Sequence, residues 1–479
     1  MTLPVERPRR RWLPAALVGT GAALVAVAVL ADPSTTVATG AGPELVAATP
    51  VLSARRTPDL LLAPVGRRKV AEAAAAVVAA APASSCLLVR DGDLDLVASK
   101  TSDGLAPASN MKILTAAVAL DTLGPATTFT TRVTGAAPSS DGTVTGNLSL
   151  VGGGDPLLTT ETGKSVWNDG PQPFTRFEDL ADQLVAKGVR RVTGGVVGDG
   201  TRHEGPTSLP GWPRRFVGNG IVGPLSALSV NDGWNVSPNP PPTGGGPVAD
   251  PPAHAAAVLT EQLRARGVIV DGPPSSGPAA SSGTTLASVE SLPVDKVVGE
   301  MLAFSDNTTA EMLAREVGRT ASGTPTTEAG TAAALAWLQS HDYDTSGVVL
   351  KDGSGLTAEN RLTCDLVADL LQRAGPDGTL AEGLAVPGQP GTLKDRLDSP
   401  KYRDAVRAKT GTLNTVTALS GWVRTVPGRN LVFSVLENTT GRNVGANELS
   451  VESRLVDSIL AYPELPPREQ VSPQPPTAR

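Results

Sequence analysis

The feature that most constrains the fold of this chain is a difference in secondary-structure pattern between its ends and its middle. Helix and strand patterns occur together over residues 68–126 and again over 287–464, whereas residues 127–286 hold short strand patterns and glycine-rich turns, with one helix pattern at 176–188. Helices and strands at both ends predict one α+β domain, built from two separated parts around an antiparallel sheet flanked by helices. The middle segment then predicts a mostly β insertion of one or two small domains.

Short patterns in the two outer parts predict defined elements. Residues 69–82 predict a helix, and "CLLVRDGDLDLVAS" at 86–99 predicts two strands joined by an Asp-Gly turn. Near the C-terminus, "VTALSGWVRT" and "NLVFSVLEN" predict an antiparallel hairpin, followed by a helix over 446–462. Further helix patterns occur at 106–120, 296–304, 308–318, 329–341 and 363–374.

The N-terminal segment has the pattern of an export sequence. Arg7 and Arg9–Arg11 precede an uncharged, mostly apolar run over 12–31 that is long enough to span a bilayer. Residues 1–31 therefore predict either a cleaved signal peptide or a retained membrane anchor, and both place the rest of the chain outside the cytoplasmic membrane. Residues 32–67 predict a disordered linker, and the Pro-rich residues 465–479 predict a disordered tail.

Charge and cysteine content narrow the classes of function. The chain carries a net charge of −6, and no basic stripe follows the N-terminal arginines, which argues against a nucleic-acid partner. Cys86 and Cys364 are its only cysteines. An extracytoplasmic location permits a disulfide between them, but the sequence leaves the paired and free states open and gives neither residue a catalytic role.

The three histidines form no catalytic or metal-binding pattern. A histidine-dependent serine hydrolase of the usual kind needs a Gly-x-Ser-x-Gly turn, and none accompanies His203, His254 or His341. Their spacing does not match zinc ligands, so we predict surface histidines and no metal site. "ETGKS" resembles the end of a phosphate-binding loop, but residue 158 is leucine where the first glycine is required.

A lysine in an apolar helix is the first candidate for chemistry. Lys112 follows Ser109 by three residues in "APASNMKILTAAVAL", so both side chains lie on one helix face. Burial beside apolar residues favours the neutral amine, and a neutral amine beside a hydroxyl activates a nucleophile. A lysine that extends from a half-buried helix into solvent explains the same pattern.

Two further motifs favour the catalytic interpretation. "SDN" at 305–307 lies between two helix patterns, and "KTGT" at 409–412 directly precedes the C-terminal hairpin. Alone, the first is typical of a helix cap and the second of a solvated strand end. Together and in this order, Ser-x-x-Lys, Ser-x-Asn and Lys-Thr-Gly are the motifs of the penicillin-binding proteins and serine β-lactamases.

The separation of the motifs narrows the resemblance. Ser305 follows Ser109 by 196 residues, which fits a domain interrupted by an insertion. With segments such as "LVGGGDPLL", "PGWP" and "LKDGSGLTAENRLT", the chain resembles the D-alanyl-D-alanine carboxypeptidases/endopeptidases of the penicillin-binding protein 4 type (peptidase family S13) over about residues 68–464. The resemblance implies a penicillin-binding-protein/β-lactamase-like domain with extra domains inserted after the first motif.

The resemblance also implies roles for eight residues. Ser109 would attack the carbonyl between two D-alanines of a peptidoglycan stem peptide, and neutral Lys112 would accept its proton. Ser305 would relay a proton to the leaving amine, and Asn307 would hold Lys112 and the substrate amide. The third motif would bind the terminal carboxylate, approach the substrate closely and supply an oxyanion-hole N–H alongside that of Ser109; its members are Lys409, Thr410, Gly411 and Thr412.

This mechanism needs no metal or organic cofactor, and β-lactams would act as inhibitors because they mimic the D-Ala-D-Ala amide. The chain differs from the family pattern where the side chain of the substrate's diamino acid is held: Phe216, Ile221 and Ala358 occupy the expected positions. We therefore hypothesise a preference for peptides whose side-chain amine is masked. A β-lactamase or esterase of the same superfamily and a non-catalytic wall-binding protein are the alternatives.

Overall fold

The computed structural model describes residues 58–166, 170–236 and 245–463. The predicted export signal or anchor, the predicted tail and residues 32–57 of the predicted linker lie outside these ranges. Helix α2 (Pro58–Ala80) begins before the predicted end of the linker at residue 67, so the linker prediction was wrong for residues 58–67. The proline at the start of this segment is compatible with a helix, because proline is favoured in the first helical turn. Within the described ranges, every helix is too short or too polar to cross a membrane.

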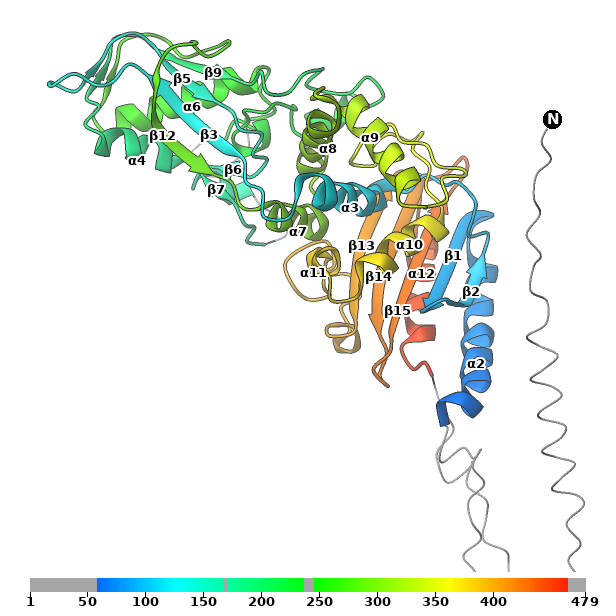
Figure 1. Ribbon diagram of the computed structural model, residues 1–479. Coiled ribbons are helices and arrows are strands. Elements are labelled where there is room, and N and C mark those ends of the chain that lie inside the picture. The colour runs from blue at the N-terminus through cyan, green and yellow to red at the C-terminus, as the bar shows by residue number, and fades with distance from the viewer. Residues whose placement is uncertain (1–57, 167–169, 237–244, 464–479) are drawn as a thin grey trace, which may run out of the picture. The chain divides into compact units, whose positions relative to one another are not determined.

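A five-stranded antiparallel sheet joins the two outer parts of the chain (Figure 1). Its order is β13-β14-β15-β1-β2, so the first strand of the chain pairs with the last. This arrangement confirms the predicted antiparallel sheet and both predicted hairpins. The strands are β1 (Ser84–Asp91), β2 (Leu94–Ser99), β13 (Val406–Leu413), β14 (Val416–Arg424) and β15 (Asn430–Asn438).

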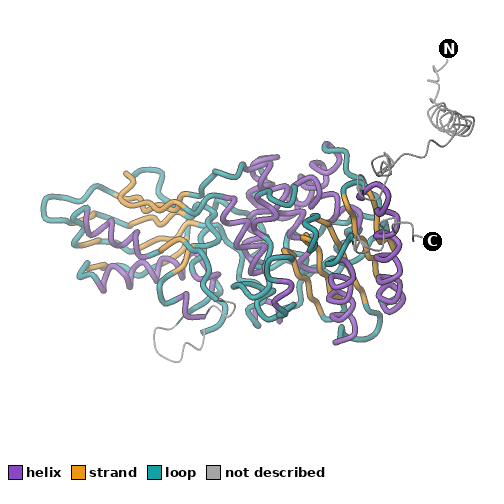
Figure 2. The backbone as a smooth tube through the Cα atoms, turned by 90° about the horizontal axis from the view of Figure 1, so that it is seen from below, coloured by secondary structure: helices purple, strands orange, loops and turns teal. Residues whose placement is uncertain are grey.

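Helices cover both faces of this sheet (Figure 2). Besides α2, the helices of the outer parts are α3 (Met111–Leu123), α7 (Val294–Phe304), α8 (Asn307–Ser322), α9 (Thr327–Ser340), α10 (Cys364–Ala374), α11 (Thr379–Gly383) and α12 (Ala446–Ile459). Successive side chains of a strand point to opposite faces: in β1, Leu87 belongs to a core with α2 and α12, whereas Leu88 belongs to a core with α3 and α10.

The inserted region has its own mixed sheet, with the order β11-β9-β5-β3-β12. The first strand of the region along the chain, β3, pairs with the last, β12. Strand β12 continues to Glu290, past the predicted end of the insertion at residue 286. The strands of the region are β3 (Thr130–Gly135), β4 (Thr143–Val144), β5 (Leu148–Val151), β6 (Leu158–Thr159), β7 (Thr175–Arg176), β8 (Arg191–Val192), β9 (Val196–Asp199), β10 (Ile269–Val270), β11 (Ser275–Ser276) and β12 (Thr284–Glu290).

The prediction of one helix in the inserted region was wrong. Besides α4 (Glu178–Ala186) and the short α5 (Arg215–Gly218), the region contains α6 (Pro251–Ala265). Asp250 caps α6 by accepting a hydrogen bond from the N–H of Ala253, and prolines occupy the first helical positions. Prolines are favoured there, so "ADPPAH" marks a helix start that the preceding Pro- and Gly-rich residues obscured.

A disulfide links the sheet to a helix of the second part. Cys86 on β1 is bonded to Cys364 at the start of α10, across 278 residues of sequence. Both residues are fully buried. The structure thus resolves the state that the sequence left open, and it ties the two separated parts of the domain together.

Candidate active site

The three motifs meet in one cavity of about 1140 Å³. Lys112 and Lys409 lie beneath its wall and are fully buried. Its lining includes the three positions at which the sequence departs from the family pattern: Phe216, Ile221 and Ala358. The predicted site residues that line it directly are Ser109, Ser305, Asn307, Thr410, Gly411 and Thr412.

Ser109 lies in a tight turn that leads into α3. The turn, Ala108–Asn110, is a short 3-10 helix, and Ala108 has a left-handed backbone with φ 45°. Non-glycine residues rarely adopt this conformation, and surrounding structure has to enforce it. Gly411 contributes by allowing β13 close to the turn: a Cβ atom there would lie 3.1 Å from the backbone nitrogen of Ser109.

Lys112 is held by three oxygen atoms. Its Nζ lies 3.0 Å from Ser109 Oγ, 2.6 Å from Asn307 Oδ1 and 2.8 Å from the carbonyl oxygen of Ser354. The amide and carbonyl oxygens can only accept, so they engage two N–H groups of the amine. When the amine is neutral, its lone pair faces the Ser109 hydroxyl, which then donates its proton to nitrogen.

Burial and nearby acids have opposite effects on the pKa of Lys112. Burial has the larger effect and lowers this pKa to about 8, although the negative charges of the acids oppose the change. The sequence around Lys112 contains no acid, and the fold supplies the acids from three other segments. They are Asp306, Asp352, Glu311 and Glu300.

The second motif occupies the junction between α7 and α8. Ser305 ends α7 with a left-handed backbone, φ 63°, and Asp306 caps α8 by accepting a hydrogen bond from the N–H of Thr309. The sharp turn brings Ser305 to the cavity and starts α8 with Asn307 facing Lys112. The helix-cap interpretation therefore holds for Asp306, the middle residue of the motif.

Lys409 contacts its own strand rather than the cavity. Its Nζ donates to the carbonyl oxygen of Thr410 at 3.0 Å. Burial, the charge of Lys112 and then that of Arg396 hold the pKa of Lys409 well below its usual range. A further hydrogen bond, from Asn110 Nδ2 to the Lys409 carbonyl oxygen at 3.2 Å, ties the Ser109 turn to β13.

The inserted region takes part in the site, which sequence reasoning missed. The carbonyl oxygen of Ile221 accepts a hydrogen bond from Asn307 Nδ2 at 2.6 Å, and the N–H of Gly223 donates to Thr308 Oγ1 at 2.9 Å. Asn307 thus points its carbonyl oxygen at Lys112 because its amide nitrogen is held from the opposite side. Short backbone contacts of this kind leave no motif in a sequence.

The loop around Asp352 is part of a segment on which the family resemblance rests, but no role in the site was predicted for it. Buried Asp352 accepts hydrogen bonds from the N–H groups of Gly355 and Thr357 and from Trp212 Nε1 of the inserted region. The loop supplies the Ser354 carbonyl to Lys112. A weak signal was present, because the glycines of "KDGSGL" indicate a tight turn.

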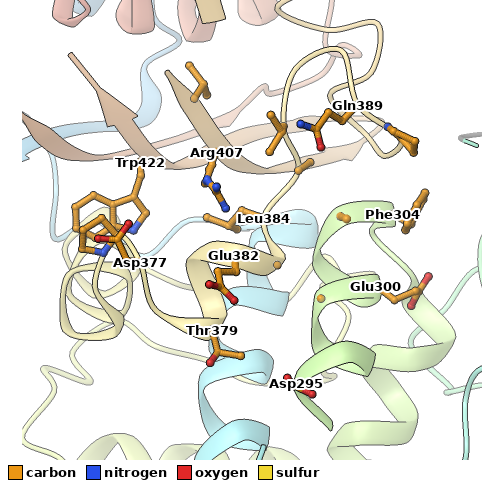
Figure 3. Close-up of a pocket in the computed structure, with 18 of the residues that line it drawn as sticks. Asp295, Glu300, Phe304, Asp377, Thr379, Glu382, Leu384, Gln389, Arg407 and Trp422 are labelled. Carbon is orange, nitrogen blue, oxygen red and sulfur yellow. The ribbon is translucent and has the colours of Figure 1, made fainter. Parts of the chain in front are cut away.

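A second cavity, of about 960 Å³, lies between α7, α11 and the first residues of β13 (Figure 3). Arg407 points into it from β13, and Trp422 lies opposite Arg407 in the sheet register. None of the eight predicted site residues, all of which are described, lines this cavity. The motif chemistry is therefore confined to the first cavity.

The prediction that all three histidines lie on the surface was wrong for His203. Its side chain is 1% exposed, and its Nε2 lies 2.7 Å from a carboxylate oxygen of Glu316 on α8. Arg202 binds the same carboxylate. A surface position was expected because a lone histidine shows no partner in sequence. The described residues contain no cluster of metal-ligating side chains.

Comparisons with known proteins agree with the geometry. The model of the D-Ala-D-Ala carboxypeptidase 3 (S13) family matches residues 76–246 and 242–457. Carboxypeptidase DacB of Mycolicibacterium smegmatis is 33% identical over 455 residues, covering 90% of this chain and 95% of that protein. The D-alanyl-D-alanine carboxypeptidase of Actinomadura sp. (strain R39) is 28% identical over 444 residues, covering 77% of this chain and 79% of that protein.

Solved structures share the fold. Penicillin binding protein 4 of Haemophilus influenzae aligns with a TM-score of 0.69 and 22% identity, covering 81% of this chain and 99% of that one. The same protein in complex with a β-lactam aligns with a TM-score of 0.61, at the same identity and coverage. The predicted fold class, an interrupted penicillin-binding-protein-like domain, is thereby confirmed.

Proposed function

Since this chain belongs to the D-Ala-D-Ala carboxypeptidase 3 (S13) family of serine peptidases, we propose that Ser109 is the nucleophile with which it cleaves D-Ala-D-Ala. The observation that carries this assignment is the 3.0 Å separation of Lys112 Nζ and Ser109 Oγ beneath the motif cavity. Two acceptor oxygens fix the other directions of the amine, so its lone pair is directed at the serine.

The reaction proceeds in two halves. Ser109 Oγ forms a bond to the carbonyl carbon of the penultimate D-alanine while Lys112 takes the hydroxyl proton. The proton passes by way of Ser305 to the amine of the leaving D-alanine, the C–N bond breaks, and an acyl-enzyme remains. Water then attacks the ester, with Lys112 again accepting a proton, and releases the shortened peptide. The N–H groups of Ser109 and Thr412 face the developing oxyanion.

The substrate class is the peptidoglycan stem peptide. Its terminal carboxylate binds at Thr410 and Gly411, which line the cavity, and Lys409 contributes once its amine turns from the Thr410 carbonyl oxygen toward the cavity. Cross-linked peptides contain the same bond, so we include endopeptidase action on them. β-Lactams acylate Ser109 in the same way, which is supported by the β-lactam complex of the Haemophilus penicillin binding protein 4. The enzyme acts outside the cytoplasmic membrane, released or held by its N-terminal segment.

One experiment tests the assignment. The chain from residue 58 onward is incubated with a fluorescent penicillin and, separately, with a pentapeptide that ends in D-Ala-D-Ala; Ser109→Ala serves as the control. We expect long-lived labelling and release of D-alanine, both absent from the variant. Labelling lost within seconds indicates a β-lactamase, and the absence of labelling indicates a non-catalytic protein.

The acylation rate should depend on pH through Lys112. The amine accepts a proton only when neutral, and its pKa is lowered to about 8. We expect kcat/KM to rise tenfold per pH unit below this value and to level off above it. Peptidase assays from pH 5.5 to 9.5 measure this limb; a rate that is flat across pH 8 contradicts the assignment of Lys112 as the base.

Side-chain preference is a separate expectation. Phe216, Ile221 and Ala358 line the cavity where the family pattern places groups that bind a free amine. These three positions hold no carboxylate, so a charged amine placed against them loses hydration and gains no ion pair from them, although Glu359 and Asp395 line other parts of the cavity. We expect peptides with an acylated side-chain amine to show about tenfold higher kcat/KM than the free amine, a difference of about 1.4 kcal/mol. A strong preference for the free amine contradicts this expectation.

A further inference from the structure

We propose that Glu311 is a positioning residue for the general base, and that it acts on Lys112 through the backbone carbonyl of Ser354. This inference rests on the proposed function, because it concerns how the base is held. Glu311 belongs to none of the three motifs and does not line the cavity. Its carboxylate is fully buried on α8, one helical turn after Asn307.

Helix α8 therefore contacts Lys112 by two routes. Asn307 and Glu311 are four residues apart, so they share one face of the helix. Asn307 Oδ1 accepts a hydrogen bond from Lys112 directly, at 2.6 Å. Glu311 Oε1 accepts from the N–H groups of Gly353 at 3.0 Å and Ser354 at 2.7 Å, and the Ser354 carbonyl accepts from Lys112 at 2.8 Å.

The loop needs this support because of its composition. Ser354 lies between Gly353 and Gly355, and glycine restricts the backbone least, so the direction of the Ser354 carbonyl is not fixed by local sterics. Asp352 holds the N–H groups that follow Ser354, those of Gly355 and Thr357. Glu311 holds the two N–H groups on the preceding side. The peptide that faces Lys112 is thus fixed from both directions.

Titratable groups surround Lys112. When charged, Asp306 at the α7–α8 junction, Glu300 on α7, Glu311 on α8 and Asp352 in the loop raise the pKa of the amine, against the larger effect of burial. Lys409 on β13 is the neighbouring cation. Burial raises the pKa of Glu311 itself to about 8, with Asp352 adding to the rise, so at neutral pH Glu311 acts on Lys112 chiefly through its hydrogen bonds to the loop. Buried Arg315 is the cation on the far side of the carboxylate.

Two substitutions of similar size test whether the loop depends on the accepting oxygen. In Glu311→Gln, the amide oxygen replaces Oε1 and still accepts both N–H groups. In Glu311→Met, neither N–H group has an acceptor. Glu316 offers a matched control: it is a buried carboxylate on the same helix, and it binds Arg202 and His203 instead of the loop.

We expect Glu311→Met to lower the rate of penicillin acylation by about 100-fold, because the Ser354 carbonyl no longer holds Lys112 in place. Glu311→Gln should stay within about fivefold of wild type and leave the acid limb of the pH–rate profile in place, because the amide still accepts both N–H groups and the carboxyl it replaces is mostly protonated below pH 8. Glu316→Gln and Glu316→Met are expected to lower thermal stability and to keep the acylation rate within about fivefold of wild type.

The outcomes separate this inference from the proposed function. Wild-type enzyme that neither labels nor releases D-alanine overturns the function itself. Active wild type, with Glu311→Gln and Glu311→Met equally impaired or with both at the wild-type rate, overturns the positioning role alone. If Glu311→Met does not fold, the rate of Glu311→Gln decides the question: impairment beyond about fivefold overturns the role, because the amide oxygen still accepts both N–H groups.

Discussion

Replacing Lys112 with methionine is expected to slow acylation of Ser109 by about 10³- to 10⁴-fold, the upper part of the range for a general base. Methionine has a similar length and fills the same buried space, but it offers no lone pair to the serine hydroxyl. The acceptors Asn307 Oδ1 and the Ser354 carbonyl lose their donor. The rate of labelling by a fluorescent penicillin measures the effect, and circular dichroism verifies the fold.

Lys296→Met is the matched control for this substitution. Lys296 lies in the first turn of α7, the helix that ends at Ser305, but its side chain is exposed and pairs only with Asp295 among the described residues. The control should acylate at the wild-type rate. Lys112→Met with more than a tenth of wild-type activity contradicts the role of the amine, because the other buried lysine, Lys409, donates to Thr410 and faces its own strand.

The motifs and the sheet were predictable because they depend on local spacing. Ser109 and Lys112 lie one turn apart in any helix, and the hairpin after Lys409 follows from alternating apolar residues around a turn. Their convergence in one cavity was implied by family resemblance and not by spacing. The structure supplies it through pairing of the last strand with the first and through the α7–α8 junction.

The parts of the site that the sequence did not predict come from residues far from Lys112 in the sequence. The acids near Lys112 come from segments about 190 to 240 residues away in sequence, Glu300 to Asp352. The contact of Ile221 with Asn307 uses a backbone carbonyl, which every residue possesses. Helix α6 was missed for another reason: its capping residue and its prolines follow a Pro- and Gly-rich stretch, whose composition is typical of loops.

The close approach of Gly355 to the Ser109 turn leads to a prediction about stability. Gly355 has a left-handed backbone, φ +87°, and a Cβ atom there would lie 1.8 Å from the carbonyl oxygen of Ala108. Ala108 is itself left-handed, so the turn cannot move away without losing the contacts that enforce its conformation. Backbone strain and overpacking together predict that Gly355→Ala lowers the free energy of unfolding by about 3 kcal/mol.

Gly428→Ala separates the two contributions. Gly428 has a similar backbone, φ +90°, in the turn between β14 and β15, and no atom lies within 4 Å of the Cβ position. It should lose about 1 kcal/mol from strain alone. Urea unfolding of both variants gives the difference, which measures the clash with Ala108.

Activity distinguishes a clash that merely destabilises the protein from one that displaces Ser109. A shift of the Ala108 carbonyl moves the adjacent Ser109 relative to Lys112, and a displacement of about 1 Å costs about 100-fold in rate. Gly355→Ala should therefore acylate about 100-fold more slowly under conditions in which it is fully folded, whereas Gly428→Ala should match wild type. Equal rates in the two variants mean that the loop packs against the turn without setting the position of Ser109.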